Sequence, residues 1–339
     1  MKGLYGRKEF QIELRQRACL PVNGRMVRIA VTACGLCGTD LHFLRHQEAW
    51  TPLGHEISAR VLEVGPEVTR VKVGQRVICE DVTACGACPA CKTGRTRLCR
   101  EGLMLGGQPG MSDEMVVHEN MLNPFEGIDP VVATMVEPLA VAVRGVDKLK
   151  LRPLSSLAIF GMGAIGLLSA GYARFTGAGR IAMFARDPHS QRNRAAEQAA
   201  AALGADEVYY SMEEDYIQRA LRRGAFDAAI VAAPPAVCAD ALSVVGYGAS
   251  VLVQGVSLGA DASVKLNVSD MVFGKKQLLT SLAEPAANFP LAIRLIQSGR
   301  VDAARVITHT LPMDRATDIR LLYGQDAPAI KTVILCGGA

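Results

Sequence analysis

The sequence predicts an α/β protein that combines a doubly wound parallel sheet with a second, mostly β domain. Residues 155–282 alternate short apolar runs with Ala-rich helical segments, which is typical of parallel strands covered by helices. Residues 1–145 instead contain short β-type runs broken by glycine. The chain has 339 residues, 50% of them hydrophobic, so it is long enough for two domains and too apolar to be disordered.

The N-terminal region is expected to form an irregular, mostly antiparallel sheet. Strands are predicted at Val27–Val31, Ile57–Val64 and Arg76–Cys79. Gly65-Pro66 and Gly74-Gln75 are turn signals between them, because both pairs interrupt the β pattern.

The central region is expected to supply the parallel sheet. Its helices are predicted to run up to Phe175 and over Arg192–Leu203. Its strands are predicted at Leu157–Phe160, Arg180–Phe184, Glu207–Tyr210, Asp227–Ala232, Ser250–Gln254 and Gln277–Ser281. The tail then alternates a helix at Phe289–Gln297, a strand near Arg305–Leu311, a helix at Asp314–Leu322 and a strand at Lys331–Leu335.

Composition and charge argue against nucleic acid and membrane as partners. The net charge is only +4 and aromatic residues make up 5% of the chain, without the concentrated basic face of a nucleic-acid binder. The stretch Pro153–Ala173 carries no formal charge, but its proline, glycines and serines argue against a membrane span. Met1–Phe10 has no apolar run behind its charges, so we expect a soluble, cytoplasmic protein. In that reducing compartment ten cysteines point to metal or catalysis rather than to disulfides.

A glycine fingerprint marks a dinucleotide site. Gly161-Met162-Gly163-Ala164-Ile165-Gly166 follows a predicted strand and opens a predicted helix. The glycines allow a tight turn and a close approach of a pyrophosphate to the helix N-terminus, so Gly161, Gly163, Ala164, Ile165 and Gly166 are the expected contacts. The alternative is a tight strand–helix turn without a ligand.

The residues that end the second central strand favour NADP(H) over NAD(H). An acidic residue is typical there in NAD-binding proteins, where it binds the ribose 2′-hydroxyl. Such an acidic residue would also repel the 2′-phosphate of NADP(H). Here Ala185 removes that repulsion, and Arg186 offers a cation suited to a 2′-phosphate. Asp187 before Pro188 is interpreted as a helix N-cap. Arg192 and Arg194 are further candidates for phosphate contacts, but solvated helix positions explain these two arginines more simply.

Four clustered cysteines predict a structural zinc site. Cys85, Cys88, Cys91 and Cys99 can close a tetrahedral shell that leaves no open position. The first three also match a ferredoxin-type iron–sulfur run, but that pattern needs a fourth cysteine after three residues and then proline. Here the gap is seven residues and Arg100 follows, so zinc is favoured over a cluster or a disulfide.

A second set of metal-ligating residue types is spread over the first half of the chain. Cys37 precedes Gly38-Thr39-Asp40-Leu41-His42, His55-Glu56 follows, and Glu137 lies just before the central region. Each residue alone is unremarkable, because a single Cys is usually core and a single Glu usually solvated. Together they supply sulfur, nitrogen and carboxylate oxygens, a plausible set for a catalytic zinc with an exchangeable position.

These motifs, in this order, resemble the zinc-dependent medium-chain dehydrogenase/reductase (alcohol dehydrogenase) superfamily over nearly the whole chain. The resemblance extends to Gly74-Gln75-Arg76-Val77 and to Ile330-Lys331-Thr332-Val333. It implies a GroES-like catalytic domain with a zinc-binding lobe, formed by residues 1–147 and 283–339, and a Rossmann domain over residues 148–282. It also implies a catalytic zinc in the cleft between them, two zinc ions per subunit, and a homodimer or homotetramer.

The resemblance also implies roles for single residues. Cys37 and His55 match zinc ligands, and Glu56 matches the acidic neighbour that ligates zinc in some members. Glu137 stands where many alcohol dehydrogenases have cysteine, which resembles the polyol, sorbitol and threonine dehydrogenase branch. Which glutamate touches the metal stays open. Thr39 and His42 match the proton relay.

The expected activity is a zinc-dependent hydride transfer between NADP(H) and a secondary alcohol or ketone. A small-molecule substrate of polyol, sugar, cyclitol or amino-alcohol type is favoured by the branch resemblance. One alternative is an NADPH-dependent aldehyde or ketone reductase, and another is a non-catalytic NADP-binding protein that kept the fold.

The five cysteines outside the two metal sets are expected to be buried small apolar residues, namely Cys19, Cys34, Cys79, Cys238 and Cys336.

Overall fold

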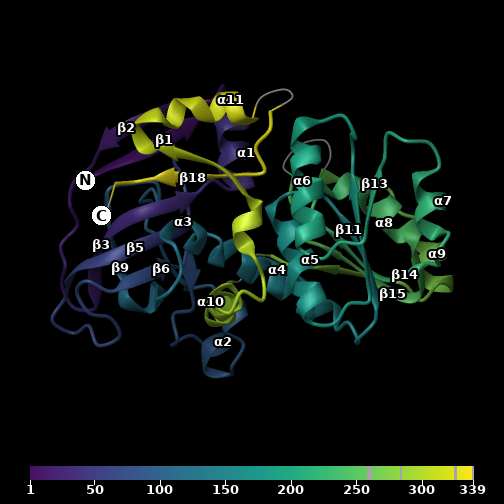
Figure 1. Cartoon of the computed structure of the whole chain (residues 1–339). Helices are drawn as coiled ribbons and strands as arrows, with labels where there is room; N and C mark the ends of the chain where they lie inside the picture. The colour runs from purple at the N-terminus through teal and green to yellow at the C-terminus, as the bar shows by residue number, and fades with distance from the viewer. Residues whose placement is uncertain (258–261, 283–284, 324–326, 338–339) are drawn as a thin grey trace.

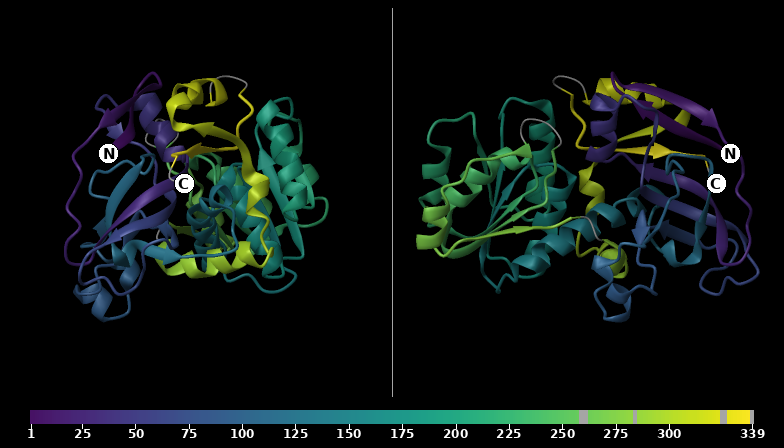
Figure 2. Two further views of the ribbon diagram at one scale, coloured as in Figure 1. Left: turned by 60° about the vertical axis from the view of Figure 1, so that its left-hand side comes forward. Right: turned by 180° about the vertical axis from the view of Figure 1, so that it is seen from behind.

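The computed structural model describes residues 1–257, 262–282, 285–323 and 327–337. Two large sheets lie side by side, an N-terminal antiparallel-rich sheet and a central parallel sheet (Figure 1). The last strands of the chain (yellow) lie beside the first ones (purple), and the two termini are close together in both views of Figure 2.

The N-terminal sheet has the strand order β10-β6-β5-β3-β18-β17, with β9 paired to β3. All pairs are antiparallel except β17 with β18. The strands are β3 (Met26–Gly35), β5 (Glu56–Val64), β6 (Arg76–Cys79), β9 (Glu114–His118), β10 (Leu122–Pro124), β17 (Ile307–Pro312) and β18 (Lys331–Leu335). The tail therefore completes a sheet that the N-terminal region begins. The predicted domain boundaries stay a prediction, and the one at residue 283 lies outside the described residues.

Two small sheets flank this one. The order β2-β1-β4 joins β1 (Lys2–Arg7), β2 (Gln11–Gln16) and β4 (Thr51–Pro52), and β7 (Val82–Thr83) pairs with β8 (Leu103–Met104). Trp50 lies between Arg7 and Arg15, whose guanidinium carbons are 4.6 Å and 4.1 Å from its ring centroid. Cation–π packing on the hairpin thus explains the single tryptophan of the chain.

A buried carboxylate ties a loop to the edge of the N-terminal sheet. Glu119 is fully buried and accepts hydrogen bonds from Nε of Arg25 at 2.7 Å and from the amides of Thr69 and Arg70 at 2.8 Å and 2.7 Å. Burial by itself would raise the pKa of Glu119, but these amides and the guanidinium lower it below its usual range.

The central sheet is fully parallel, with the order β13-β12-β11-β14-β15-β16. Its strands are β11 (Ser156–Phe160), β12 (Arg180–Ala185), β13 (Glu207–Tyr210), β14 (Phe226–Val231), β15 (Val245–Val253) and β16 (Gln277–Thr280). In chain order this is 3-2-1-4-5-6, the doubly wound arrangement of dinucleotide-binding domains. All six predicted strands are present, with ends shifted by a few residues, and the predicted Rossmann sheet is confirmed.

Helices cover both faces of this sheet because its strands are buried on both sides. Leu157 and Ile159 belong to one apolar cluster, with α5 (Ala164–Phe175) and α6 (Gln191–Ala202). Ala158 and Phe160 belong to another, on the opposite face. That face carries α7 (Tyr216–Leu221), α8 (Cys238–Val244) and α9 (Val268–Phe273).

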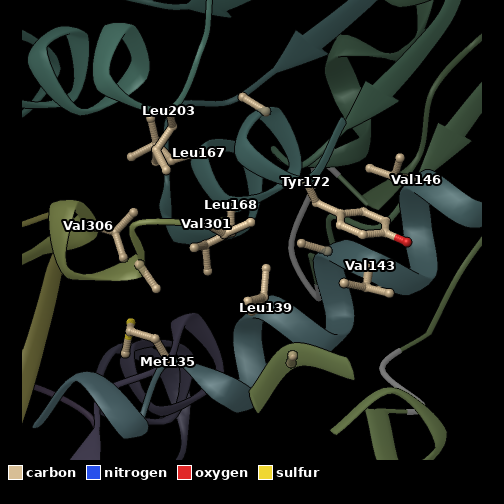
Figure 3. Close-up of a cluster of buried hydrophobic side chains, with 14 of the residues drawn as sticks. Met135, Leu139, Val143, Val146, Leu167, Leu168, Tyr172, Leu203, Val301 and Val306 are labelled. Carbon is tan, nitrogen blue, oxygen red and sulfur yellow. The ribbon is translucent and has the colours of Figure 1, made fainter. Parts of the chain in front are cut away.

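Helix α4 (Val136–Leu149) packs between the two halves of the molecule. Leu139, Val143 and Val146 recur at helical spacing on one face and meet Leu168 and Tyr172 of α5 (Figure 3). Burying each such side chain contributes about 1.5–3 kcal/mol. The cluster fixes α4 and therefore the position of Glu137 in its first turn.

The remaining helices are short. They are α1 (Gly38–His46), α2 (Pro89–Lys92), α3 (Pro130–Ala133), α10 (Phe289–Gln297) and α11 (Ile319–Tyr323), with 3₁₀ turns at Thr96–Leu98, Glu119–Met121, Pro235–Val237, Pro285–Asn288, Ala303–Val306 and Met313–Asp318. The predicted helix over Asp314–Leu322 is thus a 3₁₀ turn followed by α11, because Arg315 has a non-helical backbone conformation (φ −104°, ψ 17°). No helix of the described residues is both long and apolar enough to cross a membrane.

Two predictions were wrong. Asp187 is not the N-cap of α6, since its carboxylate accepts the amide of His189 at 2.8 Å in a local turn and the helix begins only after Ser190. Cys19 is exposed beside Arg28, whereas Cys34, Cys79, Cys238 and Cys336 are buried as expected.

Candidate active site

Four strand ends meet at one edge of the N-terminal sheet. The register pairs Gly35 with both Glu56 and Val333, and Ile57 with Cys79. This edge is therefore shared by segments at or just beyond the strand ends that lie far apart in the sequence, namely Leu36-Cys37, Gly54-His55, Glu80-Asp81 and Lys331-Thr332. The register brings Cys37, His55 and Glu56 together.

Cys37, His55 and Glu56 form a compact group, in which the ligand atoms all lie within 4.8 Å of one another. Asp40 holds two of the segments together. Its carboxylate accepts the amide of Cys37 at 2.9 Å and the amide of Gly54 at 2.9 Å, which ties the start of α1 to the residue before His55. Sequence reasoning gave Asp40 no role, although its place three residues into a helix is a capping signal.

Glu56 is 1% exposed and forms a buried ion pair with Lys331, which is 3% exposed. Nζ of Lys331 donates to Oε1 of Glu56 at 2.5 Å and to the carbonyl of Leu36 at 3.0 Å. Burial would lower the pKa of Lys331, but the charges of Glu56 and Cys37 raise it, so the lysine stays protonated. The sequence did not identify Lys331 as a site residue, because a lysine near the end of a strand is usually exposed to solvent.

The second carboxylate oxygen of Glu56 has no partner. Oε2 is buried without a hydrogen bond among the described residues. It lies against Gly35, where a Cβ atom would stand only 1.9 Å away. An unpaired carboxylate oxygen beside a thiol and an imidazole is the environment a cation satisfies, so the donor set fits zinc.

Glu137 lies near this group but outside it. It is 4% exposed, in the first turn of α4, and is absent from the set of ligand atoms within 4.8 Å of one another. Burial and then the charge of Glu56 raise the pKa of Glu137, while His55 opposes them. One lysine compensates one of the two glutamates, and the other needs a further cation or a proton.

Thr39 and His42 lie one turn apart on α1, next to Cys37. Oγ1 of Thr39 is 3.9 Å from Sγ of Cys37. His42 is partly buried, and its ring lies 4.8 Å from that of the exposed His46, a further turn along the helix. The face of α1 that carries these residues leads from the metal group to solvent.

The four clustered cysteines also come together. Sγ of Cys91 lies 3.9 Å from that of Cys85 and 3.5 Å from that of Cys88, and Sγ of Cys88 lies 3.8 Å from that of Cys99. A tetrahedral zinc with Zn–S bonds of 2.3 Å has sulfur–sulfur edges of about 3.8 Å. The amides of Ala87 and Cys88 lower the pKa of the Cys85 thiol to about 7, as suits a thiolate ligand. This group fits a closed zinc site.

The glycine loop follows β11, beside the point where the strand order reverses between β11 and β14. Gly161 has φ +113°, and a Cβ atom on Gly166 would stand 1.9 Å from the carbonyl oxygen of Gly161. The loop delivers the N-terminus of α5 to this switch point, where doubly wound folds bind dinucleotides.

Three arginines follow the second strand of the parallel sheet, and one of them approaches this loop. Arg186 follows β12 and is exposed. Nη2 of Arg192 lies 3.3 Å from the place a Cβ of Gly163 would take. Nη1 of Arg194 instead donates to the carbonyl of His189 at 2.8 Å. Arg192 is thus closer to the expected pyrophosphate than the sequence indicated.

Comparisons with known families agree with this geometry. Residues 23–127 match the family model described as alcohol dehydrogenase GroES-like domain, and residues 164–298 match the one described as zinc-binding dehydrogenase.

Several known proteins are similar to this chain over most of their length. A sorbitol dehydrogenase of Bacillus subtilis (strain 168) is 29% identical over 94% of this chain and 92% of its own. An L-threonine 3-dehydrogenase of Bacillus velezensis is 31% identical over 90% of each chain. A solved structure described as a zinc-binding dehydrogenase of Sinorhizobium meliloti 1021 bound to NADP has a TM-score of 0.87, with 26% identity and 98% coverage of both chains.

The parallel sheet, the metal-ligating groups and these relatives agree with one another. The chain therefore belongs to the zinc-dependent medium-chain dehydrogenase/reductase superfamily, in the branch of polyol and threonine dehydrogenases, and is an oxidoreductase that uses zinc and a nicotinamide cofactor on small-molecule alcohols.

Proposed function

We propose that the protein transfers hydride between NADP(H) and a secondary alcohol or ketone of polyol, sugar, cyclitol or amino-alcohol type. The observation that carries this is the compact group of Cys37, His55 and Glu56, with one carboxylate oxygen left for a cation. A zinc ion held by these residues, with Glu137 beside it, would polarise the substrate oxygen, and the nicotinamide would accept or return the hydride.

The remaining steps belong to the side chains. Thr39 lies next to Cys37 and accepts the hydrogen bond of the substrate hydroxyl, and the imidazole of His42, one turn further along α1, carries the proton outward. Asp40 fixes the spacing of the two segments that bear Cys37 and His55. Lys331 keeps Oε1 of Glu56 occupied, so only the other oxygen is free toward the metal.

NADP(H) is the proposed cofactor because the end of β12 carries Ala185 and Arg186 in place of an acidic residue. The relative from Sinorhizobium meliloti was solved with NADP bound, which supports this choice. Arg186→Ala is expected to raise KM for NADP⁺ about 10- to 100-fold, the range for a hydrogen bond between charged groups, and to leave KM for NAD⁺ within twofold. Arg194→Ala is the matched control, since its guanidinium is held by His189. Equal effects on both cofactors would contradict the assignment.

The substrate class follows the relatives, which include a sorbitol dehydrogenase and an L-threonine 3-dehydrogenase. The test is a panel of polyols, sugars, cyclitols and amino alcohols with NADP⁺ and NAD⁺, run before and after chelation. Turnover is expected to be lost with the chelator and restored by zinc. Turnover that survives both chelation and Cys37→Ala would overturn the zinc mechanism.

The same panel, read in both directions, separates this function from an NADPH-dependent reductase. Ratios of kcat/KM that strongly favour carbonyl reduction over alcohol oxidation would support the reductase.

We also propose a second, structural zinc on Cys85, Cys88, Cys91 and Cys99, so that metal analysis yields two zinc ions per chain.

A homodimer or homotetramer is the proposed assembly. β16 is an edge strand of the parallel sheet, and Val272 and Phe273 of the neighbouring α9 are 69% and 80% exposed. Light scattering on the eluting protein measures the assembly, and a monomer would refute it.

A further inference from the structure

Asp81 is a carboxylate at the active-site edge that takes no part in the proposed mechanism. It follows β6, and β6 pairs with β5 in the register Ile57 to Cys79. Continuing this register by two residues places Asp81 opposite His55. Residues directly opposite in an antiparallel pair have Cβ atoms about 4.5–5.5 Å apart and point to the same face.

The electrostatics of the site agree with this placement. Burial raises the pKa of Asp81, and His55 is the charge that opposes this most. The charge of Asp81 in turn contributes to the raised pKa of Glu137. Asp81 therefore lies close enough to His55 and Glu137 to act on the charge of both.

Oδ1 of Asp81 is shielded from solvent and has no hydrogen-bond partner among the described residues. In the adjacent Glu80, Oε1 accepts Nδ2 of Asn123 at 2.7 Å, and Oε2 is shielded and unpaired like Oδ1 of Asp81. A shielded, unpaired acceptor costs free energy unless a ligand supplies a donor.

We propose that Asp81 is a specificity-determining residue whose carboxylate binds a donor, a hydroxyl or an ammonium group, on the carbon next to the reacting carbinol. This inference rests on the proposed function. The carboxylates of the site extend it, because Asp81 and Glu56 both act on Glu137, whereas Lys331 pairs, among the described residues, with Glu56 alone. Substrates with a carboxylate or phosphate near the carbinol are therefore disfavoured, and neutral or cationic ones are favoured.

A second possibility for Asp81 is to orient His55 by a hydrogen bond, as carboxylates behind metal-ligating histidines do. No such bond joins the two side chains in the described part of the chain. The two roles differ in consequence, because an orienting residue affects zinc binding and every substrate equally, whereas a substrate-binding residue affects only substrates with the matching group.

The experiment compares Asp81→Asn with the wild type and with Glu80→Gln as the matched control. The substrates are 2-butanol, sorbitol, 1-amino-2-propanol and galactonate, with the preferred cofactor. Zinc content is measured for each variant. The dissociation constant of 1-amino-2-propanol in the ternary complex with NADPH is followed by NADPH fluorescence, which is independent of turnover.

For Asp81→Asn, kcat/KM is expected to stay within twofold for 2-butanol and to fall about 2- to 10-fold for sorbitol, the range for a neutral hydrogen bond. For 1-amino-2-propanol both kcat/KM and affinity are expected to fall about 10- to 100-fold, the range for a charged one. Galactonate is expected to improve. A selective loss with sorbitol alone identifies the donor as a hydroxyl, and a selective loss with the amine identifies an ammonium group.

Three results would overturn the inference. They are an equal loss with all four substrates, a loss of zinc in Asp81→Asn, and no change with any substrate. The proposed function fails separately, if the wild type turns over no alcohol with either cofactor.

Discussion

Replacing Lys331 by methionine tests how the buried charges of the active site are balanced. Methionine keeps most of the length and apolar contact of the side chain but removes the ammonium group. The change leaves Glu56 buried at 1% exposure, without the partner that now holds its Oε1. The carbonyl of Leu36 also loses a donor.

The structure sets the size of the expected effect. Across 2.5 Å, two unit charges attract by about 7 kcal/mol at an effective dielectric constant of 20, before desolvation is subtracted. Breaking a buried pair by removing one partner costs about 3–5 kcal/mol, because the remaining charge stays buried and uncompensated. We therefore expect Lys331→Met to lower the free energy of unfolding by about 3–5 kcal/mol.

The assay is equilibrium urea unfolding of the zinc-loaded protein, applied to Lys331→Met, Glu56→Gln and the double variant. The double variant removes both charges, so it is expected to be more stable than the sum of the single effects predicts, by at least about 2 kcal/mol. Lys276→Met is the matched control. Lys276 is partly buried, forms no ion pair among the described residues, and donates to the carbonyl of Leu242 at 2.6 Å, so its loss is expected to cost about 0.5–1.5 kcal/mol.

Two results would refute the reasoning. One is a cost for Lys331→Met no larger than that of the Lys276 control. The other is strict additivity of the two single variants, which would mean that Lys331 does not compensate Glu56 in the zinc-loaded protein.

Three further predictions concern other parts of the fold. Glu119 contributes stability that is present above the unfolded carboxyl pKa of about 4.3 and is lost as the pH falls through the lower pKa of the folded state. Glu119→Gln is expected to remove this stability, so the unfolding midpoints of wild type and variant should converge in acid. Midpoints that stay equally far apart at every pH would contradict this. Cys91→Ser is expected to leave one zinc ion per chain by metal analysis and to lower the melting temperature, and retention of two ions would exclude the site. Gly166→Ala is expected to weaken NADPH binding at least tenfold by fluorescence titration, because its Cβ would meet the carbonyl of Gly161 at 1.9 Å, and unchanged affinity would show that the loop relaxes freely.

Features that depend on neighbours in the sequence could be predicted from the sequence. The short apolar runs of the central region and the glycine fingerprint placed β11 and α5 within a residue or two. The four cysteines span only 15 residues, so their spacing alone limits how they can meet. The start of α6 was misplaced because Asp187 uses its carboxylate in a local turn, an outcome that competes with capping on nearly equal terms.

The catalytic group was found only as a set of residue types, and the residues that hold it in place were missed. Asp40 acts on Cys37 through a contact that spans 3 positions, and Lys331 acts on Glu56 through one that spans 275 positions. Asp81 carried no signal, because an acidic residue after a strand is ordinary in a sequence and becomes informative only when its oxygen is found shielded and unpaired.

The sequence by itself determined the two kinds of sheet, the dinucleotide loop and the cysteine lobe, because each follows from backbone preferences and spacing within about one supersecondary unit. Tertiary structure decided which carboxylate meets which cation. That choice depends on the register by which β3, β5, β6 and β18 end at one edge, and register is fixed by packing of the whole sheet rather than by any local pattern.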